Sequence, residues 1–138
     1  MFVQQLQSII YPPGGSRWLA ETTRRPSWQD IEVAIRRLDR HQFPFIYLFQ
    51  DSEAEDDAVP DFTVMGGNNA YTFGPEDTLF YEETLSGTEV QVWTSDQGAS
   101  FPDWQVCHDL IVVLRATRQF AETGQLDETL SWKTVRNC

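Results

Sequence analysis

FPFIYLF, residues 43–49, is the stretch that decides the fold that we predict from this sequence. Its aromatic and β-branched residues occupy both alternation phases, so a strand over 43–49 would carry apolar side chains on both faces. Pro44 has no backbone N–H to donate, which a strand tolerates at its start. We therefore expect a central strand of a sheet that is covered on both faces.

A helix is predicted just before this strand. Ser27 is a suitable N-cap residue, and Asp30 stands three positions later, where a capping box needs an acceptor. Apolar residues then recur at helical spacing, namely Trp28, Ile31, Ala34, Ile35 and Leu38. The pattern indicates a helix over about 28–41, and it places His41 in the favourable field of the helix C-terminus.

The residues before this helix are predicted to be less regular. An apolar start is followed by the break YPPGG, residues 11–15, and then by Trp18 and Leu19. This order indicates a short strand or turn followed by a loop. We treat the whole chain, 1–138, as one domain in which residues 1–26 form a less certain N-terminal extension.

Downstream of 43–49 the sequence predicts an antiparallel meander. Residues 62–65 and 70–73 flank a Gly-Gly-Asn-Asn turn at 66–69, and glycine and asparagine supply the positive φ values that hairpin turns need. Residues 79–81 and 88–94 are two further strands around a Ser-Gly turn. We expect four or five strands in this part of the chain.

A second helix is predicted to begin after Asp103 and to end at Gly124, which suits the left-handed position after a helix. Its apolar stripe consists of Val106, Cys107, Leu110, Ile111, Val113, Leu114, Thr117, Phe120 and Ala121. Apolar residues alternate over 130–135 and indicate a last strand that returns to the sheet. The expected class is α+β, an antiparallel or mixed sheet of about five to six strands with both helices packed on one face.

Charge is distributed unevenly along the chain. The 138 residues contain ten Lys or Arg and 21 Asp or Glu, a formal net charge of −11. From His41 to Leu114 there is no Lys or Arg, whereas fourteen carboxylates lie between Asp51 and Asp109. This balance argues against binding to nucleic acid or to an anionic membrane, and it favours a partner with a basic surface. Solubility alone is the alternative explanation.

The candidate partner-binding residues combine an acidic loop over 50–61 with neighbouring carboxylates and two aromatic side chains. They are Asp51, Glu53, Glu55, Asp56, Asp57, Asp61, Glu76, Asp77, Tyr81, Glu82, Glu83, Trp93 and Asp96. Aromatic anchors usually supply most of the binding energy, whereas the surrounding charges set association rate and register. Trp93, Phe101 and Trp104 fit either an interface or the core, and the sequence leaves both open.

Catalytic and metal-binding motifs are weak in this sequence. Cys107 and His108 are adjacent on a predicted helix, where their side chains diverge by about 100°, which is poor geometry for a nucleophile and its base. Glu82 and Glu83 would point to opposite faces of a strand. Cys107 and Cys138 form no CxxC pair that would indicate zinc or a disulfide framework. We expect no enzyme, cofactor or metal, and a hydrolase built from distant carboxylates is the alternative that remains.

The expected location is the cytoplasm. The first ten residues lack the basic region and the long apolar region of a secretory signal, and no stretch approaches the 18 apolar residues of a membrane span. The sparse cysteines fit a reducing compartment.

The C-terminal third carries a resemblance to a known family. Trp104, the apolar helix that ends in FAETG (residues 120–124), the acidic linker and LSW (residues 130–132) form the pattern. This order resembles the C-terminal end of the first-described immunity protein family of bacterial polymorphic toxin systems. The resemblance extends to residues 27–49 and to the VMGG hairpin at 64–67. It implies a small α+β protein, encoded beside a toxin that is often a nucleic-acid deaminase, which neutralises the toxin by binding it.

The charge pattern agrees with what this resemblance implies. A toxin that acts on nucleic acid needs a basic cleft for phosphates, and an acidic protein can cover that cleft and exclude the substrate. The expected function is therefore an antitoxin that binds a cognate toxin with a basic surface. The alternative is an acidic adaptor or assembly subunit without a toxin partner.

Overall fold

The computed structural model describes residues 1–13, 17–55, 57–76, 78–82, 88–95 and 98–134. Along the chain the elements are β1 (Gln5–Ile10), β2 (Leu19–Arg24), α1 (Trp28–Arg36), β3 (Phe45–Phe49), β4 (Phe62–Gly67), β5 (Ala70–Gly74), β6 (Thr78–Tyr81), β7 (Glu89–Trp93), β8 (Ala99–Pro102), the 3₁₀ turn η1 (Asp103–Gln105), α2 (Leu110–Thr123) and β9 (Ser131–Thr134). The class is α+β, as the sequence predicts.

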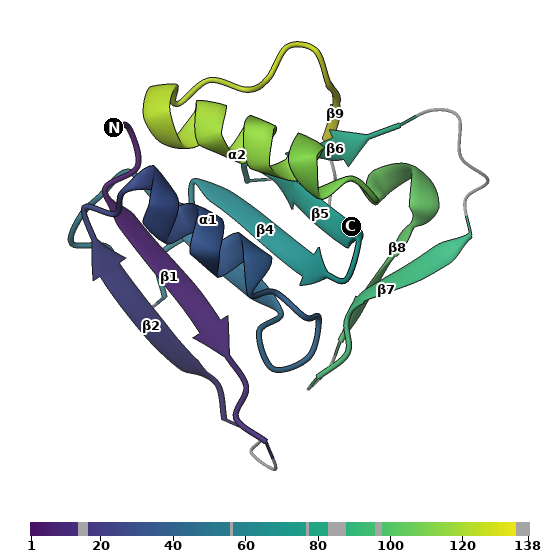
Figure 1. The fold of residues 1–138 in the computed structure, drawn as a ribbon, viewed down its shortest axis with the longest axis horizontal. Helices are drawn as coiled ribbons and strands as arrows, with labels where there is room; N and C mark the ends of the chain where they lie inside the picture. Colours follow the sequence, from purple (N-terminus) through teal and green to yellow (C-terminus); the bar gives the residue numbers. More distant parts are fainter. Residues whose placement is uncertain (14–16, 56, 77, 83–87, 96–97, 135–138) are drawn as a thin grey trace.

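The main sheet has five antiparallel strands in the order β2-β1-β3-β4-β5, so the segment FPFIYLF supplies its middle strand. This prediction is confirmed. Ile46 and Leu48 point toward the helices, whereas Phe45 and Tyr47 belong to the opposite alternation phase. Figure 1 shows both helices lying across the same face of the sheet.

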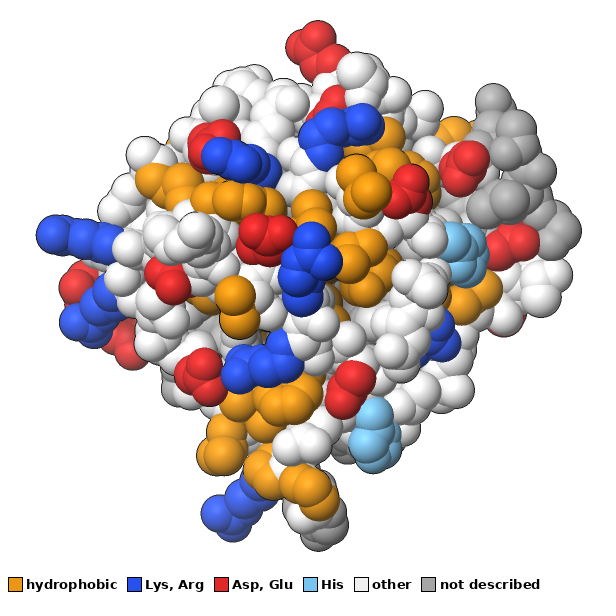
Figure 2. Space-filling view, in the orientation of Figure 1, with side chains coloured by type: hydrophobic (Ala, Val, Ile, Leu, Met, Phe, Trp, Pro, Cys, Tyr) orange, Lys and Arg blue, Asp and Glu red, His pale blue; other side chains and the backbone are white. Residues whose placement is uncertain are grey.

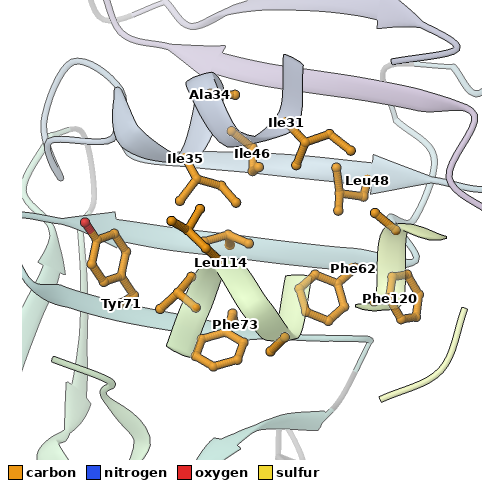
Figure 3. Packing of buried hydrophobic residues seen from close by; sticks show 14 of the residues in the cluster. Ile31, Ala34, Ile35, Ile46, Leu48, Phe62, Tyr71, Phe73, Leu114 and Phe120 are labelled. Carbon is orange, nitrogen blue, oxygen red and sulfur yellow. The ribbon is translucent and has the colours of Figure 1, made fainter. Parts of the chain in front are cut away.

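The core fills the space between the helices and this face of the sheet (Figure 3). Ile31 and Ile35 of α1 are completely buried, and Phe120 of α2 stacks on Phe62 with ring centroids 4.6 Å apart. Burial of one such side chain stabilises a fold by about 1.5–3 kcal/mol. The helices are therefore fixed to the sheet mainly by their apolar stripes.

The first helix begins where the sequence predicts and ends earlier. Ser27 and Asp30 form the capping box, with bonds of 3.1 and 2.8 Å between side chain and backbone N–H. The helix ends at Arg36, because the Asp39 carboxylate accepts hydrogen bonds from the backbone of His41 and Phe43 and holds a turn there. His41 therefore lies outside the helix, and its Nδ1 is 3.0 Å from Thr94 Oγ1.

The β4–β5 hairpin is confirmed, with a tighter turn than expected. Asn68 and Asn69 alone form it, at φ values of 52° and 65°, and the two glycines extend β4. Gly67 has φ 137°, and a Cβ there would stand 2.5 Å from the backbone oxygen of Leu38. Only glycine fits at this contact between the hairpin and the turn after α1.

The described part of residues 1–26 contains two strands of the main sheet, where the sequence predicts one short strand or turn and then a loop. β1 is hydrogen-bonded between β2 and β3. Its polar residues Gln5, Gln7 and Ser8 are 2%, 1% and 5% exposed. β1 corresponds to the short strand or turn that the sequence predicts before the break at 11–15. β2 occupies residues that were predicted to be a loop, because its largely exposed side chains show no apolar pattern.

The meander predicted over 62–94 is wrong beyond β5. β6 pairs with the C-terminal strand β9, and β7 pairs with β8, a strand that the sequence did not predict. The last strand therefore joins a separate two-stranded sheet and not the main one.

The second helix starts later than predicted. It begins at Leu110, with Asp109 as its N-cap, and it ends at Gly124 in the left-handed conformation, as expected. Asp103 instead starts η1. The backbone of Cys107 exchanges two hydrogen bonds with Tyr71 of β5, at 2.7 and 2.9 Å, and this pairing holds the preceding residues in an extended conformation.

Candidate functional site

Within the part of the chain that the structure describes, the face of the main sheet that points away from the helices, called here the back face, is covered at its two ends. At one end lies the acidic loop, residues 50–61, which the buried Gln5 holds by a bond of 2.9 Å from its Nε2 to the Ser52 oxygen. At the other end β7 packs against Ala70 and Met65. The part between these two covers is a groove.

This aromatic groove consists of two neighbouring cavities that share Tyr47 and Met65 as lining residues. The narrower cavity, about 290 Å³, is lined by Ile9, Tyr11, Trp18, Phe45, Tyr47, Met65 and Trp93. The second, about 340 Å³, is lined by Tyr47, Val59, Pro60, Thr63, Met65, Gly74, Pro75, Glu76, Thr78 and Leu79. Burial raises the pKa of Tyr47, so its hydroxyl stays neutral at physiological pH.

A third cavity, about 610 Å³, opens between the acidic loop and the strands β1 and β2. Glu53 and Glu55 line it, and Arg24 reaches Glu53 at 3.1 Å. Both partners of this ion pair are about two-thirds exposed, so the pair contributes little to stability. The carboxylates of the loop are therefore exposed to solvent, where their negative charge can act on an approaching partner.

The loop is shaped by its own carboxylates. Asp51 accepts a hydrogen bond from the backbone of Glu53, and Asp61 accepts one of 2.7 Å from the backbone of Gln50. These bonds close the loop at both ends and leave Glu55 and Asp57 exposed. An acidic surface of defined shape results, because the turn-forming carboxylates fix the backbone that carries the others.

The helix face has a different charge character. Figure 2 shows Lys and Arg side chains lying among acidic and hydrophobic ones over α1 and α2. Arg36 pairs with Glu32, and Arg118 pairs with Glu122, both at i, i+4 spacing. The helix face therefore carries paired charges of both signs, whereas the acidic loop lies on the back face.

The structure brings several of the predicted site residues together. Glu53, Glu55, Glu76 and Trp93 line cavities of the back face. Asp51, Asp57 and Asp61 belong to the acidic loop beside them, and Asp56, Asp77, Glu83 and Asp96 lie outside the described residues.

Tyr81 and Glu82 are at a different place, beside η1. The Tyr81 ring meets Trp104 edge-on at 5.7 Å, and Lys133 Nζ lies 4.5 Å from the centre of the Trp104 ring. The backbone of Glu82 donates to the Trp104 oxygen at 2.7 Å. Neither residue lines the two cavities of the groove, although Thr78 and Leu79 of β6 line the second one.

Trp93 belongs both to the core and to the groove. Its ring packs edge-on against Phe45 at 5.2 Å, and its Nε1 donates to Ser95 Oγ at 2.8 Å. The half-buried indole also lines the narrower cavity. Phe101 packs into the small cluster around Val92.

Sequence reasoning missed six of the seven residues that line the narrower cavity, namely Ile9, Tyr11, Trp18, Phe45, Tyr47 and Met65. The sequence did contain one indication of the groove. Phe45, Tyr47 and Phe49 alternate along one strand, so their rings lie on the same face of the sheet. The strand order places Ile9 and Met65 next to Phe45, and it was this order that the sequence left open.

The nucleophilic side chains are poorly placed for catalysis. Cys107 is buried, and burial raises the pKa of its thiol to about 11. His108 precedes α2, and its Nδ1 lies 2.8 Å from the Asn69 oxygen. Within the described ranges, no group of three or more His, Cys, Asp and Glu side chains could hold a metal ion.

A membrane span is not present among the helices of the described residues, because none combines the necessary length with sufficient apolar character. No protein-family model matches the chain, and no curated protein matches its sequence. The resemblance to the immunity proteins therefore stays a prediction.

Proposed function

We propose that this protein is an antitoxin, or immunity protein, that binds a cognate bacterial toxin with a basic surface and blocks it without catalysis. The observation that carries the proposal is the acidic loop, which Gln5 holds beside the aromatic groove on the back face. Exposed charges of one sign accelerate association with an oppositely charged partner, and aromatic side chains in a cleft supply binding energy. The back face combines both.

A toxin that modifies nucleic acid, such as a deaminase, carries basic residues that bind the phosphates of its substrate. The acidic loop can occupy the position of those phosphates, so the bound antitoxin excludes the substrate. We place this action in the cytoplasm, where nucleic acid is accessible to such a toxin. No reacting group of the antitoxin is needed, because occupation of the cleft is sufficient.

The proposal is tested by co-expression of this chain with the product of the adjacent gene. We expect the two proteins to co-elute as a complex in size-exclusion chromatography, and we expect this chain to restore growth of cells that express the toxin. If the adjacent gene encodes no toxin-like domain and its product elutes separately, the antitoxin proposal is wrong. An acidic adaptor or assembly subunit would then explain the surface better.

A further inference from the structure

The narrower cavity of the aromatic groove has the size of a side chain. Its volume of about 290 Å³ lies at or below the lower limit of about 300–1,000 Å³ for small-molecule sites. Five of its seven lining residues are aromatic, and Trp18 is 44% exposed at its margin. An inserted group would therefore meet ring faces and edges on several sides.

Aromatic rings of this chain already hold cations elsewhere. Arg37 lies 4.5 Å from the centre of the Phe43 ring, and Arg118 lies 5.6 Å from that of Trp28. The attraction arises because the face of an aromatic ring carries partial negative charge, and arginine uses it most often. The narrower cavity offers the same chemistry with several rings instead of one.

The charges around the groove also favour a cation. Glu76 lines the second cavity, and Glu53 and Glu55 stand on the same face beyond β1. Among the residues that line the three cavities of this face, Arg24 is the one cation, and it pairs with Glu53 at 3.1 Å, so Glu55 and Glu76 supply the negative charge that this pair does not cancel. A positively charged guest would thus gain Coulomb energy from the surrounding carboxylates.

We propose that the aromatic groove receives an arginine side chain from an extended segment of the partner, an inference that rests on the proposed function. The guanidinium enters the narrower cavity between Tyr47, Trp18 and Trp93. A neighbouring apolar side chain of the same segment covers Val59, which is 63% exposed, in the second cavity. The acidic loop then steers the partner, and the groove selects arginine.

A peptide titration tests this inference without the toxin. The probe is a capped pentapeptide in which one arginine is flanked by valine and threonine, and the control peptide carries citrulline, which has the same shape without the charge. Binding is followed by the NMR shifts of the Trp93 and Trp18 indole N–H groups. We expect the citrulline peptide to bind about three- to tenfold more weakly than the arginine peptide.

Variants locate the binding to the groove. Trp18→Leu and Tyr47→Leu should each weaken the arginine peptide about threefold or more. Tyr81→Leu is the control, because its ring is also partly buried but lies beside Trp104. Trp18 is the more exposed of the two, so Trp18→Leu should fold even if Tyr47→Leu does not.

Three outcomes would overturn the inference. They are equal binding of the arginine and citrulline peptides, unchanged binding in Trp18→Leu, and a dimer of this chain in sedimentation that Trp18→Leu dissociates. The last result would mean that a second copy covers the groove. A failed titration beside an intact complex with the toxin would reject the arginine site alone, whereas failure of co-elution rejects the proposed function.

Discussion

A hydrogen bond of 2.9 Å from Gln5 Nε2 to the Ser52 backbone oxygen connects β1 of the main sheet to the acidic loop. Gln5 is only 2% exposed, and its Oε1 also accepts a bond of 2.7 Å from Gln7 Nε2. Two buried amide side chains thus form a chain of hydrogen bonds that ends on the loop backbone. The position of the loop over the back face depends on this contact.

Replacement of Gln5 tests the role of this contact. Gln5→Met keeps the length of the side chain, but it removes the bond to Ser52 and leaves the Gln7 amide without its acceptor. We expect the free energy of unfolding to fall by about 1–3 kcal/mol in urea denaturation. Hydrogen exchange should accelerate in the acidic loop.

Gln4→Met is the matched control for this experiment, because the Gln4 side chain donates to the nearby Met1 oxygen and not to the acidic loop that the structure describes. Its free energy of unfolding should change by less than about 0.5 kcal/mol. Equal effects of the two substitutions would show that Gln5 does not anchor the loop.

The elements that local sequence specifies were predictable. Ser27 and Asp30 cap α1, Gly124 ends α2, and residues 68–69 form a hairpin turn, each because a short stretch of chain determines its own hydrogen bonds. The middle position of β3 was also predictable, because apolar residues on both phases leave no face for solvent.

The parts that depend on distant contacts were not predictable in this way. β6 pairs with β9, about fifty positions away, and no local pattern encodes that choice. β2 was predicted to be a loop, because its exposed and half-buried side chains show no apolar pattern and its place in the sheet depends on pairing with β1. The groove could not be predicted without the strand order, because it is this order that places Ile9 and Met65 beside Phe45.

Asp127 should make stability depend on pH in the acidic range. Hydrogen bonds from Thr129, together with Arg115 at 3.0 Å, lower the pKa of this carboxyl in the folded protein. Its contribution to stability is therefore present above the unfolded pKa of about 4, and it is lost as the pH falls through the lower folded value.

The substitution Asp127→Asn measures this contribution. At pH 7 we expect a loss of about 1.5–3 kcal/mol, because Asp127 is buried and hydrogen-bonded to a charged group. The difference between Asp127→Asn and the wild type should shrink when thermal unfolding is measured below pH 4. A difference that stays constant down to pH 2 would contradict this account.

Cys107 should be chemically inert in the folded protein. With a pKa of about 11, its thiolate is about two orders of magnitude rarer at neutral pH than that of a free cysteine. In a Cys138→Ser background, a disulfide reagent such as DTNB should react at least that much more slowly with the native than with the urea-unfolded chain. Rapid labelling of the native protein would contradict the burial of this thiol.

The same reasoning predicts that the protein has no turnover of its own. Screens against esters, phosphodiesters, glycosides and nucleosides should be blank, because Cys107 is neutral and the His41 and His108 rings contact Thr94 and Asn69. Turnover that disappears on substitution of any one of these three residues would establish an enzyme.

The acidic loop should control the rate at which the partner binds. In the variant Glu53→Gln/Glu55→Gln/Asp57→Asn, three exposed charges are removed while the turn-forming Asp51 and Asp61 stay. We expect the association rate with the toxin to fall about three- to tenfold at low salt, because steering depends on the field of these carboxylates. The wild-type and variant rates should converge at high salt, where the Debye length falls to about 3 Å.

A second triple variant, Glu32→Gln/Glu122→Gln/Glu128→Gln, changes the net charge by the same amount on α1, α2 and the segment that follows α2. If the binding face includes the acidic loop, this control should slow association much less, since its charges lie on the helix side of the sheet. Stopped-flow association of all three proteins across a salt series decides the question. Equal slowing by the two triple variants would show that only total charge matters and that the toxin docks elsewhere.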